Sequence, residues 1–302
     1  MYGDRSMNTL SLVTGGAGFI GSNLVDNLLE QGHSVICVDN ESANNEKFYW
    51  NDKSWNVNAD VTDYKAMKNI FTGVDYVFHL AAESRLQSAI QNPIQAVEKN
   101  CVGTTVMLQC AREAGVKRFI YSSTSSGYGN NPYPNVETQP DDCLNPYSAS
   151  KVAGEKFCKM YRDLYGLETV VFRYFNVFGN RSPARGQYAP VIGIFQRQKE
   201  AGEPLTIVGD GSQRRDFVHV SDIARANYLA CTMPLDGYNG EVLNVGTGSA
   251  YSVQQIADAV SDNQTYIPKR DGEMETTFAD ITRIGKVLGW KPEIDVIDYL
   301  QT

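Results

Sequence analysis

Tyr147 and Lys151 are the residues whose types and spacing most clearly allow chemistry in this chain. They are four positions apart in a segment with a helical pattern, so both side chains lie on one face of the helix. An ordinary tyrosine has a pKa of about 10, and a neighbouring ammonium group lowers it by about one to three units. We therefore expect a tyrosinate that takes a proton from a substrate hydroxyl while hydride leaves the same carbon.

Hydroxyl side chains gather about 20 residues before this helix, in the run Ser122–Ser126. The run ends a segment with a strand pattern, and ligands of open α/β sheets bind beyond the carboxyl ends of the strands. Thr124 is placed to donate a hydrogen bond to a substrate oxygen there. The alternative is that these hydroxyls only satisfy backbone groups at the end of the strand.

A glycine-rich turn follows the first apolar run, with Gly15, Gly18 and Gly21 at the spacing of a dinucleotide site. Gly15 permits a tight turn, Gly18 lets the backbone approach a pyrophosphate, and Gly21 lets the helix pack near the strand. The unpaired N–H groups at the start of that helix attract phosphate. The turn therefore predicts a bound dinucleotide.

Asp39 ends the second expected strand, about 20 residues after the glycine turn. A carboxylate there accepts hydrogen bonds from the adenine ribose and repels a 2′-phosphate, which favours NAD over NADP. Asp60 and Val61 follow a further strand-like segment and are expected at the adenine, although a surface turn is an alternative for them.

These residues need a sheet to hold them, and the first half of the chain alternates strand and helix patterns. Such alternation predicts a Rossmann-type, doubly wound parallel sheet with helices on both faces. The expected strands are Leu10–Thr14, Ser34–Val38, Asp75–His79, Lys117–Ser122 and Thr169–Phe175, and the expected helices are Phe19–Glu30, Pro93–Ala114 and Pro146–Tyr165.

The second half is less regular and predicts a smaller α/β part that binds substrate. Its expected helices are 188–201, 221–231, 252–260 and 281–288. We assign residues 1–178 and 219–248 to the NAD-binding domain. Residues 179–218 and 249–302 form the expected C-terminal substrate domain.

Charge and composition exclude several classes of function. The net charge of −8 disfavours nucleic acid and anionic membrane as partners. Six scattered cysteines without a C-x-x-C pair, and three distant histidines, predict free thiols and no metal site. There is no secretion signal and no run of about 18 apolar residues, so we expect a cytoplasmic protein.

Taken together, the motifs resemble the extended short-chain dehydrogenase/reductase family, and within it the nucleotide-sugar epimerases. The resemblance covers nearly the whole chain and includes residues outside the motifs above. Those further marks are His79–Ala82, Asn100, Arg173–Asn176, Arg215–Phe217 and Arg270–Glu273.

The resemblance implies a role for each matching position. Thr124, Tyr147 and Lys151 are the implied catalytic residues. The implied NAD contacts are Gly15, Gly18, Phe19, Ile20, Gly21, Asp39, Asn40, Asp60, Val61, Leu80, Ala81, Ala82, Asn100, Ser122, Tyr147, Lys151 and Tyr174. The implied contacts to a UDP-sugar or other nucleotide sugar are Ser84, Thr124, Asn176, Gln187, Tyr188, Ile207, Arg215, Arg270 and Glu273.

The residues after Thr124 decide the branch of the family. Dehydratases and decarboxylases of this family carry acids there, whereas Ser125 and Ser126 cannot act as acids at neutral pH. An NAD-dependent 4-epimerase of the UDP-glucose/UDP-galactose type is therefore the expected activity, with a 4-keto intermediate. A UDP-glucuronate 4-epimerase and a keto-sugar nucleotide reductase stay open as alternatives.

Two further expectations come from the resemblance. Thr277 stands where a bulky tyrosine restricts some epimerases to plain hexoses, so its small side chain leaves room for an N-acetyl group. Family members commonly form homodimers through helices like those expected at 93–114 and 146–165, which implies a homodimer here.

Overall fold

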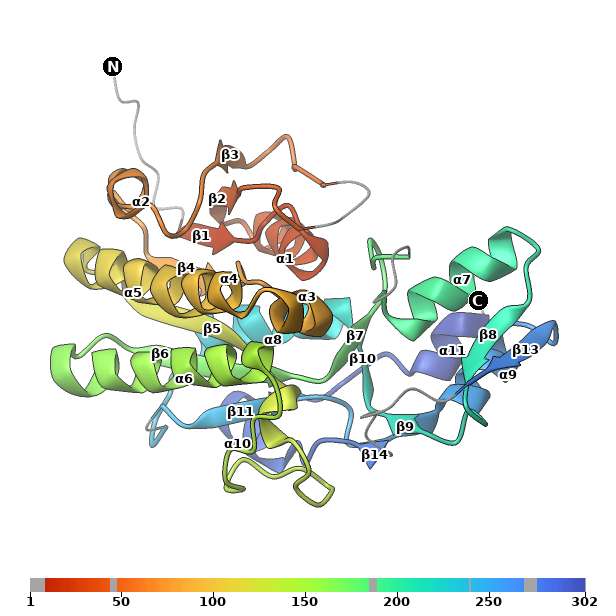
Figure 1. Cartoon of the computed structure of the whole chain (residues 1–302). Coiled ribbons are helices and arrows are strands. Elements are labelled where there is room, and N and C mark those ends of the chain that lie inside the picture. Colours follow the sequence, from red (N-terminus) through yellow and green to blue (C-terminus); the bar gives the residue numbers. More distant parts are fainter. Residues whose placement is uncertain (1–8, 44–47, 185–188, 239, 269–275, 302) are drawn as a thin grey trace.

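A seven-stranded parallel sheet holds the larger part of the molecule together (Figure 1). The computed structural model describes residues 9–43, 48–184, 189–238, 240–268 and 276–301. Within these residues the strand order is β11-β6-β5-β4-β1-β2-β3. The direction of winding reverses between β1 and β4, and a crevice for ligand opens at such a switch point. The strands are β1 (Leu10–Thr14), β2 (Ser34–Asp39), β3 (Trp55–Asn58), β4 (Tyr76–His79), β5 (Arg118–Thr124), β6 (Thr169–Tyr174) and β11 (Val242–Val245).

Helices cover both faces of this sheet, which confirms the doubly wound fold predicted from the alternation. One core packs under α1, α8 and α10, and a second packs under α2, α5 and α6. The central strands β5 and β6 are buried at every residue, as a parallel sheet covered on both faces requires. The helices are α1 (Phe19–Glu30), α8 (Val220–Thr232), α10 (Thr282–Leu288), α2 (Tyr64–Ile70), α5 (Gly103–Ala114) and α6 (Pro146–Tyr165).

Local sequence signals fix the ends of α6. The Asn145 side chain accepts a hydrogen bond from the Ser148 amide at 2.9 Å, and Pro146 occupies the first turn. Gly166 ends the helix in the left-handed region, with φ of 71°. The predicted bounds of this helix are therefore confirmed.

The helix expected over 93–114 differs from the one observed. It divides into α4 (Pro93–Val97), a π-helical turn η1 (Glu98–Val102) and α5, and α3 (Leu86–Gln91) precedes it. A π-turn inserts a residue into the helical repeat and turns one side chain away from its regular position. Asn100 lies within this turn and is fully buried.

A third core belongs to the smaller part. It lies among α7 (Val191–Glu200), α9 (Val253–Val260), α11 (Val296–Gln301) and the parallel pair β8 (Leu205–Val208) and β13 (Gln264–Ile267). A 3-10 turn, η2 (Ser125–Tyr128), follows β5. Short strands connect the two parts: β7 (Asn176–Phe178) with β10 (Phe217–His219), and β9 (Arg214–Arg215) with β12 (Tyr251–Ser252) and β14 (Thr276–Thr277).

The boundary between the parts differs from the expected one at α10. Ile284, Leu288 and Trp290 pack in the core under α1 and α8, although the sequence boundaries placed 249–302 with the smaller part. The Trp290 indole donates to the Asp222 carbonyl on α8 at 3.0 Å. In the described part of the chain, no helix is both long and apolar enough to cross a membrane.

Candidate active site

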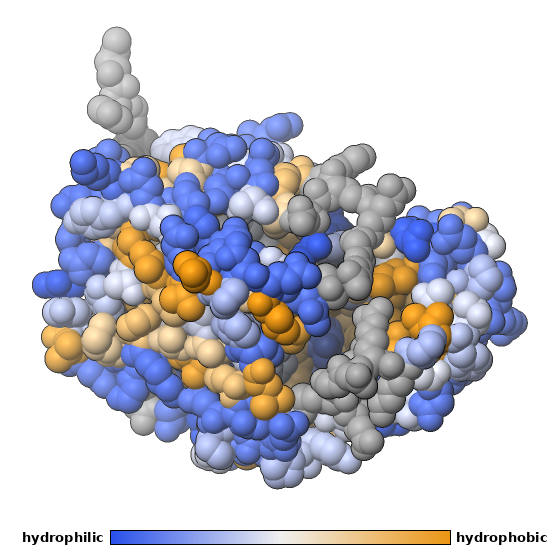
Figure 2. All heavy atoms as spheres, in the orientation of Figure 1, coloured by the Kyte–Doolittle hydropathy of each residue, from blue (hydrophilic) through white to orange (hydrophobic). Residues whose placement is uncertain are grey.

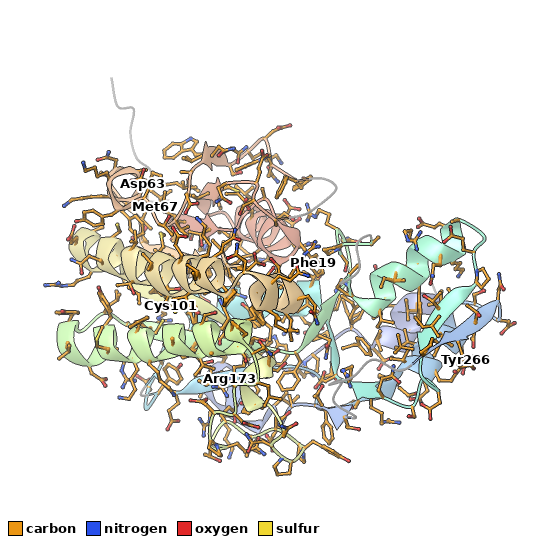
Figure 3. The ribbon with its side chains drawn as sticks, viewed as in Figure 1. Phe19, Asp63, Met67, Cys101, Arg173 and Tyr266 are labelled. Atoms are coloured by element: carbon orange, nitrogen blue, oxygen red, sulfur yellow. The ribbon has the colours of Figure 1, made fainter. Side chains whose placement is uncertain are left out.

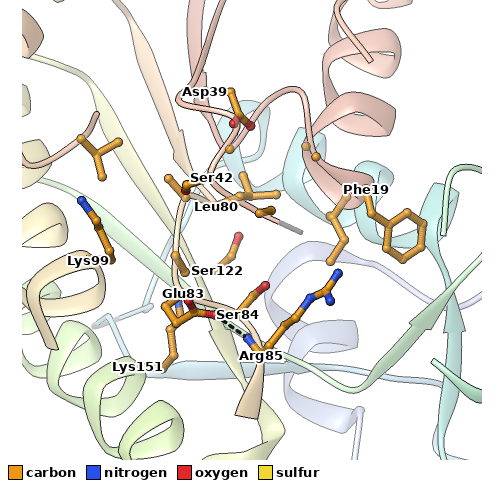
Figure 4. A pocket seen from close by; sticks show the side chains of 18 of the residues that line it. Phe19, Asp39, Ser42, Leu80, Glu83, Ser84, Arg85, Lys99, Ser122 and Lys151 are labelled. Carbon is orange, nitrogen blue, oxygen red and sulfur yellow. Dashed lines mark hydrogen bonds between the residues drawn. The ribbon is translucent and has the colours of Figure 1, made fainter. Parts of the chain in front are cut away.

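The carboxyl ends of the central strands border one elongated cavity of about 550 Å³, termed here the main cavity. Asp39 lies at one end of it and Lys151 at the other (Figure 4). The structure thus brings together nearly all of the residues expected at NAD and at the reacting sugar. They are Gly15, Gly18, Phe19, Ile20, Gly21, Asp39, Asn40, Asp60, Val61, Leu80, Ala81, Ala82, Ser84, Ser122, Thr124, Tyr147, Lys151 and Tyr174.

The glycine turn leaves no room for side chains. A Cβ on Gly15, whose φ is +67°, would lie 2.8 Å from the Ala81 nitrogen. A Cβ on Gly21 would lie 2.0 Å from the Gly15 carbonyl oxygen. No side chain of the described residues caps α1 at Gly18, so the N–H groups of its first turn can bind a ligand phosphate. This cradle fits the pyrophosphate of NAD.

Asp39 closes the crevice at the end of β2. Its Oδ2 accepts from the Ala17 amide at 3.1 Å, which fixes the carboxylate against the glycine turn, and its Oδ1 accepts from the Glu41 amide at 2.8 Å. Burial raises the pKa of Asp39, and these backbone hydrogen bonds oppose the rise. The remaining lone pairs of this carboxylate suit the hydroxyls of an adenine ribose.

Asp60 is already held by protein groups. Its Oδ2 accepts from the Lys99 ammonium at 2.7 Å and from the Asn40 amide at 2.8 Å, and its Oδ1 accepts from the Thr62 hydroxyl and amide. Burial alone would raise the pKa of Asp60, but these hydrogen bonds hold it well below its ordinary value. Lys99, which sequence reasoning missed, therefore stands beside Asp60 in the cavity wall.

Thr124 and Tyr147 meet at the opposite end of the main cavity. Burial raises the pKa of Tyr147, a hydrogen bond with the Thr124 side chain opposes the rise, and the charge of Glu83 adds to it. Thr124 Oγ1 accepts from the Ser126 amide at 3.1 Å, so its own proton can be donated to another oxygen. The pair can hold one substrate hydroxyl between a donor and a proton acceptor.

Lys151 lies one helical turn from Tyr147 and is buried. Its ammonium stands 4.3 Å over the Tyr121 ring, whose hydroxyl donates to the Lys151 carbonyl. Burial lowers the pKa of Lys151 to about 8, against the opposing effects of Cys158, Glu155 and Cys101. Burial raises the pKa of Tyr147 on balance, so the acidification of Tyr147 by the Lys151 ammonium stays a prediction.

A second cavity of about 270 Å³ lies between β7, α7 and β8. Asn176 and Arg215 line it, as expected for contacts to a nucleotide. Ile207 does not: its side chain is fully buried in the core of the smaller part, while Thr206 and Val208 face the cavity. Pro190 and Val177 line both cavities. Gln187, Tyr188, Arg270 and Glu273 lie outside the described residues.

Comparison with known proteins agrees with this geometry. Residues 11–246 match the model of the family described as "NAD dependent epimerase/dehydratase family". This chain belongs to that family. Its cofactor is NAD, and its doubly wound fold is that of the solved epimerases.

Proteins of similar length have been named and solved within the family. The chain is 37% identical over 308 residues to the UDP-glucose 4-epimerase of Mycolicibacterium smegmatis, with 94% of each chain covered. The crystal structure of the Thermotoga maritima UDP-glucose 4-epimerase with UDP-glucose has a TM-score of 0.90 at 35% identity, covering 97% of this chain and 96% of that one. A UDP-N-acetylglucosamine 4-epimerase from Methanobrevibacter ruminantium, in complex with UDP-N-acetylmuramic acid, has a TM-score of 0.89 at 32% identity, with 97% and 96% covered.

In this member of the family, Asn100 supports the cavity wall from behind and does not line the cavity. Its Oδ1 accepts from the Glu83 amide at 2.7 Å, and its Nδ2 donates to the Glu83 carbonyl and to Ser150 Oγ. The π-turn η1 buries the Asn100 amide, so its predicted place at the nicotinamide is corrected to a support of the Glu83 backbone. Since Ser150 lies on α6, Asn100 also connects this wall to the helix of Tyr147.

The wall beside the glycine turn depends on a buried histidine. His79 bonds the Thr14 hydroxyl at 2.7 Å and the Thr104 hydroxyl at 3.0 Å, and Thr14 Oγ1 accepts from the Ala81 amide. Burial, with the nearby charge of Lys151, lowers the pKa of His79 to about 3. His79 is therefore a neutral structural residue of the epimerase fold.

A buried ion pair underlies the catalytic strand. The Arg173 guanidinium, labelled in Figure 3, donates to both carboxylate oxygens of Glu155 at 2.8 and 2.7 Å. Glu155 in turn accepts from Ser123 Oγ at 2.5 Å. Because Glu155 lies one turn beyond Lys151 on α6, this pair joins α6 to the ends of β5 and β6.

Three charged side chains of the main cavity are not among the site residues expected from the sequence: Glu83, Arg85 and Lys99. Glu83 Oε1 accepts from the Arg85 amide, drawn as the dashed line in Figure 4. Their place directly after β4, at the carboxyl edge of the sheet, was the signal that could have found Glu83 and Arg85. Among the residues that the structure describes, no cluster of three or more His, Cys, Asp or Glu side chains could hold a metal ion.

The pKa of Lys151 predicts the sign of one pH effect. Its ammonium form is the one that can bind a ribose hydroxyl as a donor and favour a tyrosinate, and with a pKa of about 8 that form is lost as the pH rises through this value. We expect kcat, measured from pH 6 to 10 with saturating substrate, to fall above about pH 8. If only the deprotonation of Tyr147 controlled the rate, kcat would instead rise with pH. A kcat that still rises at pH 10 therefore contradicts the role of the Lys151 ammonium.

Proposed function

We propose that this protein is an NAD-dependent nucleotide-sugar 4-epimerase acting on UDP-glucose and UDP-galactose through a transient 4-keto sugar. One observation carries the proposal: Thr124, Tyr147 and Lys151 stand together at one end of a dinucleotide cavity. The second cavity, with Asn176 and Arg215 in its wall, adjoins it through Pro190 and Val177. A nucleotide sugar spanning both cavities presents its sugar to Tyr147.

Two independent lines support the reaction type. The relatives named above act, by their names, as UDP-glucose or UDP-N-acetylglucosamine 4-epimerases. Ser125 and Ser126 follow Thr124 on the turn η2, where an elimination of water needs acids. Oxidation and re-reduction at one carbon require only one proton acceptor beside the sugar, and Tyr147 provides it.

The chain's own residues supply proton transfer and alignment. Tyr147 takes the proton of the C4 hydroxyl and later returns it, while Thr124 donates a hydrogen bond to the same oxygen. Lys151 holds a cofactor ribose by hydrogen bonds, and Asp39 and the glycine turn hold the adenosine and pyrophosphate. NAD⁺, when bound, supplies the acceptor that takes hydride from C4 and gives it back.

Epimerisation also requires the keto sugar to expose its other face. The Arg215 guanidinium suits a diphosphate, because its planar fork matches phosphate oxygens. Because Arg215 binds the diphosphate in the second cavity, the sugar is free to rotate beside Tyr147. Tight nucleotide binding with loose sugar binding is therefore the expected pattern of affinities.

The test is incubation of the purified protein with UDP-glucose, UDP-galactose, UDP-N-acetylglucosamine, UDP-glucuronate and the dTDP-hexoses. We expect the 4-epimer of UDP-glucose and UDP-galactose to form without added NAD and without net absorbance change at 340 nm. Stoichiometric NADH consumption indicates a reductase instead. Turnover of UDP-glucuronate alone indicates a uronate epimerase, and either result overturns the proposal.

We extend the proposal to N-acetylhexosamines on the basis of Thr277. This residue lies on β14, paired in register with Arg215 of β9, and itself lines neither of the two cavities. A threonine there takes up far less volume than a tyrosine. Turnover of UDP-N-acetylglucosamine in the same panel tests this extension without affecting the main proposal.

We also propose a homodimer. Apolar side chains on α3, α4, η1 and α6 face solvent, and they form the orange area over these helices in Figure 2. Ile94 is 80% exposed, an unusual state for an isoleucine unless a partner covers it. Light scattering should give twice the chain mass. The area contains Ile90, Ile94, Val97, Val102, Met160 and Leu164.

The division of labour and the location are proposals too. We propose that the larger part, with two of the three cores, binds NAD and that the smaller part binds the nucleotide of the substrate. All six cysteines are free thiols, which is the usual state in the reducing cytoplasm. We place the enzyme there.

A further inference from the structure

Asp26 on α1 connects two segments that are far apart in the sequence. Its Oδ2 accepts from Arg181 Nη2 at 2.6 Å, and its Oδ1 accepts from the Asn51 side-chain amide at 2.7 Å. The side chains of Asp26 and Arg181 are each 27% exposed, so this ion pair is partly shielded from water. α1 is also the helix whose N-terminus faces the cofactor phosphates.

A second contact at Arg181 reaches the glycine turn itself. The guanidinium lies 4.1 Å from the centre of the Tyr49 ring, a cation–π contact. The Tyr49 amide donates to the Ala17 carbonyl at 3.0 Å, within the glycine turn. Beside it, the Asn23 side-chain amide donates to the Asn180 carbonyl at 3.0 Å. Arg181 is thus held from α1 and from the turn that cradles the pyrophosphate.

The backbone of Arg181 has a conformation that needs support from surrounding contacts. Its φ of +66° lies in the left-handed region, which arginine rarely adopts. Such conformations persist where surrounding contacts over-determine them. Two residues further on, Pro183 lines the main cavity. Its carbonyl oxygen lies against Gly193 of α7. In Figure 1 this segment, between β7 and α7, runs past α1.

We propose that Asp26, Tyr49 and Arg181 form a clasp that holds the cavity wall at 179–184 over bound NAD and slows its release. The three are positioning residues, since Pro183 and not Arg181 faces the cavity. An epimerase regains its NAD⁺ in every cycle, so slow cofactor release costs it no turnover. The clasp concerns how the protein retains its cofactor, which goes beyond the proposed function. It rests on that function only in the argument that slow release costs an epimerase no turnover.

The test measures how fast NAD leaves the loaded enzyme. Asp26→Asn keeps an acceptor for Asn51 but removes the ion pair. Arg181→Asn removes the charge and the stacking while tolerating a positive φ. Loss of the partly shielded ion pair predicts release a few-fold faster in Asp26→Asn, and loss of both the ion pair and the cation–π contact predicts release about fivefold to tenfold faster in Arg181→Asn. The double variant should be no faster than Arg181→Asn, because the ion pair between the two residues can be lost only once.

Controls separate the clasp from a general loss of stability. Arg197→Gln breaks a more exposed ion pair, which Arg197 of α7 forms with Glu203 at 3.3 Å, and should leave release unchanged. Arg181→Lys restores the charge and should recover most of the retention. The fall in kcat should stay below about twofold in all variants, since no residue at the reacting carbon changes.

Release at the wild-type rate in both single variants overturns the clasp, as does an equal acceleration in Arg197→Gln or an additive double variant. The release rate is read from NAD remaining on the protein after desalting, so it needs no turnover. A wild-type protein that retains NAD but epimerises no UDP-sugar overturns the proposed function, while the release rates still decide the clasp.

Discussion

Replacing Tyr147 by phenylalanine should lower kcat by about a thousandfold, the usual contribution of a well-placed general acid–base group. The change removes one oxygen atom and leaves the ring, so packing around α6 is kept. Thr124 loses its hydrogen-bond partner but still bonds the Ser126 amide. KM for the nucleotide sugar should change little, because the residues expected to bind the nucleotide line the second cavity and are unchanged.

The measurement is the initial rate of epimer formation, with circular dichroism and bound NAD as checks of folding. Tyr161→Phe is the matched control, because it removes a hydroxyl from the same helix where that hydroxyl bonds Gln109, away from the main cavity. Turnover of Tyr147→Phe within about tenfold of wild type refutes Tyr147 as the acid–base group.

The raised pKa of Tyr147 changes how its activation is understood. Sequence spacing placed Lys151 near Tyr147 and suggested that the ammonium acidifies the phenol. Burial acts on both groups in the structure, raising the pKa of Tyr147 and lowering that of Lys151. Positive charge from a bound nicotinamide ring would add to that of Lys151 in favouring the tyrosinate, which ties proton removal to the oxidised cofactor.

Features that depend on local geometry could be predicted from the sequence. The glycine turn, Asp39 at the end of β2 and the capped helix α6 follow from spacing and backbone preference. Their meeting in one cavity follows from the rule that the carboxyl ends of parallel strands share one edge. The fold class and the arrangement of Tyr147 with Lys151 were therefore within reach.

Features set by packing between distant segments were not. In β8, successive side chains face opposite sides, and packing puts Ile207 inward with Leu205 and leaves Thr206 and Val208 toward the cavity. The π-turn that buries Asn100 has no local signal that we could read. The pairing of Lys99 with Asp60 joins residues 39 positions apart, which spacing rules do not reach.

Replacing Gly21 by alanine should weaken NAD binding by about a hundredfold. The new Cβ would lie 2.0 Å from the Gly15 carbonyl oxygen and 2.8 Å from the Gly16 Cα, and both are backbone atoms that cannot rotate away. The first turn of α1 must therefore move away from the glycine turn, which separates its N–H groups from the phosphates they bind. Overpacking of this kind costs about 1–3 kcal/mol, and about 2.7 kcal/mol is a hundredfold in affinity.

Calorimetric titration of the cofactor-free protein with NAD measures the effect directly, and thermal unfolding shows whether the variant is folded. Gly285→Ala is the matched control: it adds the same methyl group to a helical glycine of α10, where the nearest atom outside the helix is 3.6 Å away. The helix should gain slightly from the better helix former, and NAD affinity should not change. If Gly21→Ala binds NAD as tightly as Gly285→Ala, the close approach of α1 to the glycine turn is not what forms the pyrophosphate site.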